Sequence, residues 1–101
     1  MQILNIEFYY DPGHGWYKVA HSVLAQLSIA DKISTYSYMH GSYAYLEEDC
    51  DATLFFKVAE SAGIKVNIIY PIDSYREQSH IRDYKRYQDQ NQNQSQNKLT
   101  K

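Results

Sequence analysis

The 101-residue sequence predicts a small α+β domain. We expect an antiparallel sheet in the order β-β-α-β-β-α-β, with two helices on one face. Two observations support this prediction. Several segments carry apolar side chains at every second position, while two others carry them at helical spacing. Glycine-containing turns separate the segments. A chain of this length buries roughly 60 to 65% of its unfolded surface, so one domain can form without metal or disulfide bonds.

The first two strands are expected to form a hairpin. Apolar and polar side chains alternate along residues 2–10, which predicts a half-buried strand. Residues 11–15 (DPGHG) are a dense turn signal. The chain then returns as a second strand over residues 16–19, which places Trp16 and Lys18 on the same face.

A second hairpin follows a short helix. Apolar side chains recur at helical spacing over residues 20–28, and a single turn is expected at residues 29–33. Tyrosines then alternate on both sides of His40 and Gly41, which predicts two strands closed by a tight turn. Gly41 supplies the positive φ that such a turn needs. The tyrosines are Tyr36, Tyr38, Tyr43 and Tyr45.

An acidic run at residues 47–51 (EEDCD) precedes the one long helix. Its apolar stripe has the spacing i, i+1, i+4, i+5, i+8, typical of one buried face; it comprises Leu54, Phe55, Val58, Ala59 and Ala62. Asp49 or Asp51 is expected to cap the helix N-terminus, where negative charge suits the dipole. Gly63 is expected to end the helix in the left-handed conformation.

The C-terminal third is predicted to contain a last strand and a polar extension. Residues 64–70 alternate as a strand that Pro71 ends. Residues 72–87 are polar with sparse anchors, and we expect a short docked or partly frayed helix capped by Ser79; its apolar face is Ile81, Tyr84 and Tyr87. Residues 1–87 then form a single domain, and the Gln/Asn-rich residues 88–101 form a flexible tail.

Composition favours an intracellular protein. Cys50 is the only cysteine, which excludes an intramolecular disulfide and disfavours the common zinc patterns. No basic start followed by an apolar run is present, and no segment has the length of a membrane span, so the cytoplasm of a bacterial host is the expected location. Residues 1–60 carry a net charge of −5 and residues 61–101 carry +3. This asymmetry indicates two faces of opposite sign that steer a partner, or ordinary solvated surface.

Three catalytic or ligand-binding hypotheses compete with simpler ones. The glycines beside His14 let another molecule approach the backbone while Trp16 stacks on it, although a hairpin turn and a core tryptophan explain the same residues. Cys50 at a helix start resembles a nucleophile that His14 would activate, but the surrounding acids disfavour the thiolate. Histidines and acids of the ligand type are present without any dense metal-binding pattern, so no metal and no cofactor are predicted.

Two binding hypotheses remain. Eleven tyrosines are more than so small a core can hold. Either they form a partly solvent-exposed sheet face that binds a partner, or they are present only because tyrosine favours strands. Cations and aromatics in the C-terminal segment predict weak, salt-sensitive nucleic-acid binding. That alternative site comprises Arg76, Arg82, Lys85, Arg86 and Tyr84. Tyrosine and arginine also favour a protein partner. An exposed edge strand would permit a homodimer.

Two blocks of the sequence resemble those of short accessory proteins carried on bacterial plasmids and phages. They are residues 11–19 (DPGHGWYKV) and residues 36–52, which contain YSY and YLEEDCDA, and the resemblance covers roughly residues 5–85. It implies a mobile-element setting, in which small proteins without catalytic motifs block host defence complexes, as anti-CRISPR proteins do. We therefore expect a non-catalytic inhibitor that binds a protein such as a CRISPR effector complex. The expected contact residues are Glu47, Glu48, Asp49, Asp51, Tyr43, Tyr45, Trp16 and His14.

Overall fold

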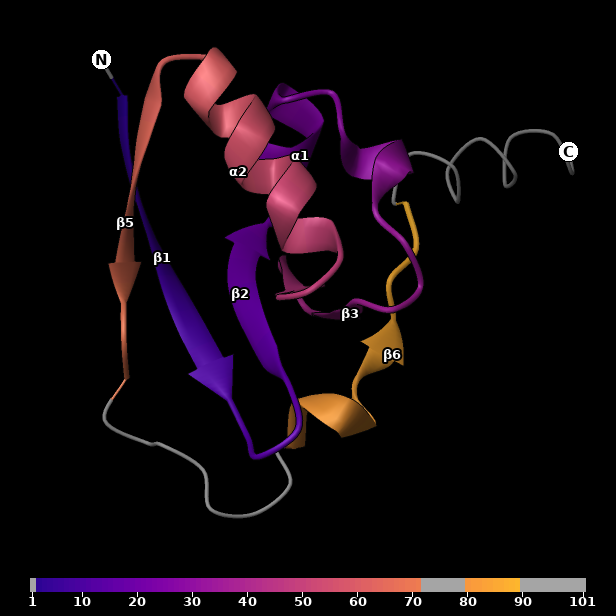
Figure 1. Ribbon diagram of the computed structural model, residues 1–101. Helices are drawn as coiled ribbons and strands as arrows, with labels where there is room; N and C mark the ends of the chain where they lie inside the picture. Colours follow the sequence, from indigo (N-terminus) through magenta and orange to yellow (C-terminus); the bar gives the residue numbers. More distant parts are fainter. Residues whose placement is uncertain (1, 72–79, 90–101) are drawn as a thin grey trace, which may run out of the picture.

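The computed structural model describes residues 2–71 and 80–89. The elements are β1 (Gln2–Tyr10), β2 (Gly15–Ala20), α1 (His21–Gln26), the 3₁₀ turn η1 (Ala30–Lys32), β3 (Tyr38–His40), β4 (Tyr43–Glu47), α2 (Asp51–Ser61), β5 (Ile64–Ile69), the 3₁₀ turn η2 (His80–Asp83) and β6 (Lys85–Arg86). Within the described residues the strands form one sheet in the order β5-β1-β2-β4-β3-β6. Figure 1 shows α1 and α2 together against this sheet. The predicted α+β class is confirmed.

Both predicted hairpins are present. β1 and β2 pair antiparallel with Phe8 opposite Tyr17, and the Phe8 and Tyr17 ring centroids lie 4.5 Å apart. Tyr17 in turn contacts Phe56 of α2 edge-on at 4.9 Å, which fastens the helix to this hairpin. In the second hairpin Gly41 has the expected positive φ of 59°. β3 begins only at Tyr38, so Tyr36 lies in the loop before the sheet.

Helix α2 buries only part of the predicted stripe, since Ala62 is exposed, and its N-terminus is capped differently. Phe55 and Ala59 are fully buried, and Gly63 ends the helix with a φ of 77°. Cys50 occupies the N-cap position and makes no capping hydrogen bond through its side chain. The expectation that Asp49 or Asp51 caps the helix was therefore wrong. The Asp51 carboxylate accepts hydrogen bonds from Ser34 and Ser37, whose donors lie in the loop before β3.

The sheet is mixed, because β5 pairs with β1 in parallel. Helix α2 returns the chain to the end of the sheet where β1 begins, so that Gln2 lies opposite Ile64 and Leu4 opposite Val66. The other strand pairs are antiparallel. The expected antiparallel sheet thus gains one parallel pair at its edge.

Residues 80–89 form less helix than expected and an additional strand. The predicted helix is reduced to the 3₁₀ turn η2, after which β6 pairs with β3. A continuous helix would hold Ile81 and Tyr87 on one side. Instead Ile81 packs on one face of the sheet and Tyr87 on the other, because β6 carries the chain along the sheet edge. Ser79, with the rest of residues 72–79, and the tail beyond residue 89 lie outside the described residues.

Apolar side chains cover both faces of the sheet. The larger core lies under α1 and α2 and includes Val19, Leu24, Leu46 and Phe55. The second cluster lies on the opposite face of the sheet. It comprises Trp16, Tyr38, Tyr45 and Ile81, with Tyr9 and Tyr84 packed against it. Residues 80–84 therefore cover part of that face.

Candidate functional site

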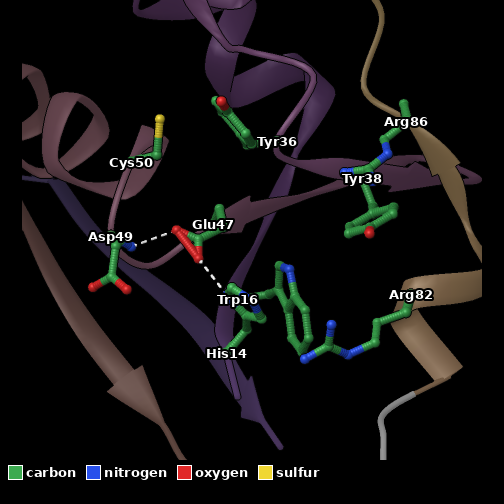
Figure 2. Close-up of a pocket in the computed structure, with 9 residues that line it drawn as sticks. All are labelled: His14, Trp16, Tyr36, Tyr38, Glu47, Asp49, Cys50, Arg82 and Arg86. Atoms are coloured by element: carbon green, nitrogen blue, oxygen red, sulfur yellow. Dashed lines mark hydrogen bonds and ion pairs between the residues drawn. The ribbon is translucent and has the colours of Figure 1, made fainter.

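A hollow of about 460 Å³ opens beside the second cluster. Its lining comes from the turn after β1, from the loop before β3, from β2, β3 and β4, from the loop before α2 and from the C-terminal segment. The lining residues are His14, Trp16, Tyr36, Tyr38, Glu47, Asp49, Cys50, Arg82 and Arg86. Figure 2 shows these side chains converging from elements that are far apart in the sequence. We refer to this site as the hollow.

An ion pair between Asp11 and Arg82 fixes one side of the hollow. Arg82 donates from Nε to Asp11 Oδ2 at 2.7 Å and from a terminal nitrogen to Oδ1 at 2.9 Å. The same Oδ1 accepts the backbone amides of Gly13 and His14 at 2.9 and 3.0 Å. The hydrogen bond to Asp11 is the main cause that raises the pKa of Arg82. This pair joins the first turn to the C-terminal segment.

Glu47 fixes the opposite side. Its Oε2 lies 3.1 Å from His14 Nδ1, and its Oε1 accepts the backbone amide of Asp49 at 2.7 Å. Both contacts are drawn in Figure 2. Only 8% of Glu47 is exposed, whereas the His14 side chain is 47% exposed. Glu47 is therefore a positioned acceptor that orients His14 rather than a mobile surface charge.

Aromatic rings and guanidinium groups stack along the wall of the hollow. Trp16 and Tyr38 are buried and meet edge-on, with ring centroids 6.3 Å apart. Arg82 lies over Trp16 at 5.4 Å, and Arg86 lies over Tyr38 at 4.6 Å. Arg86 also donates to the Thr35 carbonyl at 3.2 Å. These contacts hold both cations against the ring faces.

The indole nitrogen of Trp16 is buried without a hydrogen-bond partner among the described residues. Figure 2 shows the nitrogen end of the ring facing the space between Glu47 and Tyr38, while the six-membered ring extends towards Arg82. Buried polar groups in proteins are nearly always hydrogen-bonded. An unsatisfied buried donor thus belongs to a residue that lines the hollow.

A buried polar cluster supports the hollow from behind. Ser37 is fully buried; its hydroxyl donates to Asp51 Oδ2 at 2.5 Å and accepts the backbone amide of Glu47 at 2.9 Å. The Ser37 carbonyl accepts the Tyr87 amide at 2.9 Å. One serine thus ties together the ends of β4, α2 and the C-terminal segment.

The exposed Cys50 lies beside Ser34 and Asp51. Its Sγ lies 3.7 Å from Ser34 Oγ and 3.8 Å from Asp51 Oδ1. Figure 2 shows the thiol directed away from His14. In this geometry Cys50 is a rim residue of the hollow.

The predicted acidic patch is smaller than expected. Glu47 and Asp51 are buried and hydrogen-bonded, whereas Glu48 and Asp49 are exposed. The side chains of Glu47 and Asp51 face inward because backbone amides and serine hydroxyls of the loops around them supply donors. The interpretation of Glu47 and Asp51 as surface charges was wrong.

Of the predicted aromatic anchors, two are buried and one is exposed. Trp16 is 1% exposed and Tyr45 is 6% exposed, so neither projects from the surface. Burial is the main cause that raises the pKa of Tyr45 to about 12. Tyr43 is exposed, with Lys18 Nζ over its ring at 4.3 Å, and it is outside the lining of the hollow. His14 and Trp16 do line the hollow.

The residues of the nucleic-acid alternative are only partly available. Arg82 is engaged by Asp11, and Tyr84 stacks on His40 with centroids 4.4 Å apart. Lys85 and Arg86 are exposed on β6. Arg76 lies outside the described residues.

Asp11, Tyr36, Tyr38 and Ser37 take part in the site although the sequence did not mark them as site residues. Asp11 has the pattern of an ordinary turn residue, and the tyrosines have the pattern of an ordinary strand. The only sequence signal that includes them is the pair of blocks at residues 11–19 and 36–52, which supply most of the lining.

The chain matches no family model, no curated protein and no solved structure. Within residues 2–71 and 80–89, no group of three or more His, Cys, Asp or Glu side chains is placed to hold a metal ion. The helices in the same part of the chain all lack the length and apolarity needed to cross a bilayer.

Proposed function

We propose that this protein is a non-catalytic binding protein whose protein partner inserts a side chain or short segment into the hollow. The hollow carries this proposal, because it is lined by Trp16, whose indole nitrogen is a buried donor without a hydrogen-bond partner among the described residues. At the rim, Tyr36 is 67% exposed and Arg86 is also exposed. Tryptophan, tyrosine and arginine are the residue types that contribute most binding energy at protein interfaces.

The fixed pairs in the site favour binding over proton transfer. Asp11 and Arg82 are engaged with each other, and both oxygens of Glu47 are occupied. Such groups are already ordered, so a partner loses little additional conformational freedom when it binds. Preorganisation of this kind suits a stoichiometric inhibitor or adaptor.

The charges of the hollow define what fits it. Carboxylates of Glu47 and Asp49 lie on one side, and the guanidinium groups of Arg82 and Arg86 lie on the other. A segment of mixed charge, with a carbonyl or hydroxyl oxygen for Trp16 Nε1, complements this arrangement. Complementary charge gives specificity more than raw affinity.

The setting that we propose is a mobile genetic element in a bacterial cytoplasm, with a host defence nucleoprotein complex, such as a CRISPR effector, as the target. The resemblance of two sequence blocks to plasmid and phage accessory proteins supports this part of the proposal. These blocks supply His14, Trp16, Tyr36, Tyr38, Glu47, Asp49 and Cys50 to the hollow. The exposed Glu48 and Asp49 are the acids that remain for a basic surface on the target.

Affinity capture from a bacterial host lysate, with and without nuclease, tests the proposal. We expect a protein to be captured in stoichiometric amount by the wild type after nuclease, and to be lost with Tyr36→Ala combined with Arg86→Glu. Lys57→Glu on the solvent side of α2 is the matched control and should retain it. Capture that disappears with nuclease would favour the nucleic-acid alternative through Lys85 and Arg86. Equal capture by all variants would contradict a role for the hollow.

A further inference from the structure

Strand β5 has a strand neighbour on one side only among the described elements. Its outer edge runs over Ile64–Ile69, contains no proline and carries one charge, that of Lys65. Unpaired strand edges are templates for a further strand unless charges, prolines or bulges protect them. The protection here is limited to one lysine.

Exposed apolar and amide side chains accompany this edge. Ile3 is 59% exposed and Ile69 is 47% exposed, and the register of β1 and β5 places both on the same face of the sheet. Between them the Asn67 amide donates to Asn5 Oδ1 at 3.2 Å. These residues form a strip of Ile3, Asn5, Asn67 and Ile69 that reaches the open edge.

We infer that β5 pairs antiparallel with β5 of a second copy of this chain, across a twofold axis at Asn67. In this register Asn67 faces Asn67 of the partner subunit, Lys65 faces Ile69 of the partner subunit, and Val66 faces Ile68 of the partner subunit. The two sheets then form one continuous sheet. An isologous contact of this kind closes after two copies.

Side-chain chemistry selects this register. Asn67 already donates a hydrogen bond to Asn5 within each chain. At the axis the two Asn67 side chains lie opposite each other, so that four asparagines form a hydrogen-bonded row across the joined sheet. Each Lys65 lies beside Ile69 of the partner subunit, and Glu7 is the next residue across in that subunit's sheet. At each of the two symmetric positions Lys65 therefore lies near Glu7 of the partner subunit. No residues of like charge lie opposite each other. Centring the axis on Val66 would leave the exposed Ile69 outside the pairing.

The dimer would be bivalent. The hollow is built on β2, β4, β3 and β6, at the opposite end of the strand order from β5. Pairing through β5 therefore leaves both hollows open at the two far ends of the joined sheet. Two linked sites increase the apparent affinity for a partner that presents its contact surface twice. The dimer itself does not depend on what the hollow binds.

Sedimentation equilibrium tests the dimer with a charge variant and its rescue. The wild type should sediment as a dimer. Ile69→Lys places a lysine opposite Lys65 at both symmetric positions, and the dissociation constant should rise by about tenfold or more. Lys65→Glu combined with Ile69→Lys should restore the dimer, since each pair becomes attractive. A monomeric wild type, or a dimer that Ile69→Lys leaves unchanged, would overturn the inference.

Cross-linking tests the register. Asn67→Cys in a Cys50→Ser background should form an intersubunit disulfide under mild oxidation, because directly opposite residues of antiparallel strands have Cα atoms within disulfide range. Asn5→Cys in the same background is the control. Its two copies would lie three strand spacings apart, roughly 14 Å, and should stay unlinked. A folded Asn67→Cys variant that does not cross-link, or equal cross-linking of both, would contradict the register.

Discussion

Asp11 shows how much one turn residue contributes to this molecule. Its carboxylate shapes its own turn through two backbone amides and holds Arg82 from the C-terminal segment. The Asp11 side chain is 1% exposed and that of Arg82 is 25% exposed, so solvent screens this pair less than a surface pair. The contact therefore connects local turn geometry with the shape of the hollow.

Asp11→Asn should reduce the free energy of unfolding by about 2 kcal/mol, because it removes a charged hydrogen-bonded pair while an amide oxygen remains for the turn. Urea unfolding followed by the fluorescence of Trp16, the only tryptophan, measures this loss. Lys32→Ala is the control. Lys32 Nζ lies 3.8 Å from Asp31 Oδ1, and both side chains are largely exposed. That change should stay within about 0.5 kcal/mol. Equal losses for both variants would contradict the structural role of Asp11.

His21 gives the fold a predictable pH dependence. Burial is the main cause that lowers the pKa of His21, and its Nε2 is buried without a hydrogen-bond partner among the described residues. The unfolded chain therefore binds a proton more readily than the folded one. The contribution of His21 to stability should be constant well above pH 6.5 and should fall as the pH drops through the ordinary histidine pKa towards the lower folded value. Urea midpoints between pH 5 and 8 measure this slope, which His21→Gln should reduce; an unchanged slope would contradict it.

At the scale of elements, the C-terminal segment covers the face of the sheet that bears the hollow. Ile81 is 2% exposed and packs with Trp16, Tyr38 and Tyr45. Ile81→Ala should cost roughly 2–4 kcal/mol because the cluster cannot fully close the resulting cavity. Ile3→Ala removes the same atoms from a 59% exposed position and should cost much less. Comparable losses in urea unfolding would show that residues 80–84 do not pack as described.

Alternation and glycine placement were enough to predict most elements. Apolar and polar side chains alternate along residues 2–10 and 64–70, because one face of these edge-side strands packs under the helices, and this local pattern can be recognised in the sequence. The parallel pairing of β5 depends on where α2 returns the chain, which no local pattern records. Strand β6 has only two residues, too few for any periodicity.

The candidate site was predicted in part, for a physical reason. His14, Trp16, Glu47 and Asp49 were marked by residue type and do line the hollow. Charge alone does not show which acids fold inward, and so Glu47 and Asp51 were expected on the surface. Their inward orientation depends on donors from distant loops, such as Ser34 and Ser37 for Asp51. The basic and acidic sets were expected to be alternatives, yet Arg82 and Arg86 border the same hollow as Glu47 and Asp49.

For the whole molecule, the arrangement separates two surfaces. The hollow lies towards the β3 and β6 end of the sheet, and the open edge of β5 lies at the other end (Figure 1). The larger core under α1 and α2 lies on the opposite face of the sheet from the hollow. We propose that the hollow binds a foreign protein and that the β5 edge pairs with a second copy of the chain.

The most direct test of the hollow as the binding site is hydrogen exchange of the protein, free and in its nuclease-treated complex. We predict slower exchange on binding at the backbone amides of residues 34–37, 48–50 and 84–88, which surround the hollow. The exposed side of α2 should exchange at the same rate in both states. Slower exchange confined to α1, α2 or the β5 edge, with no change around the hollow, would contradict the proposed function.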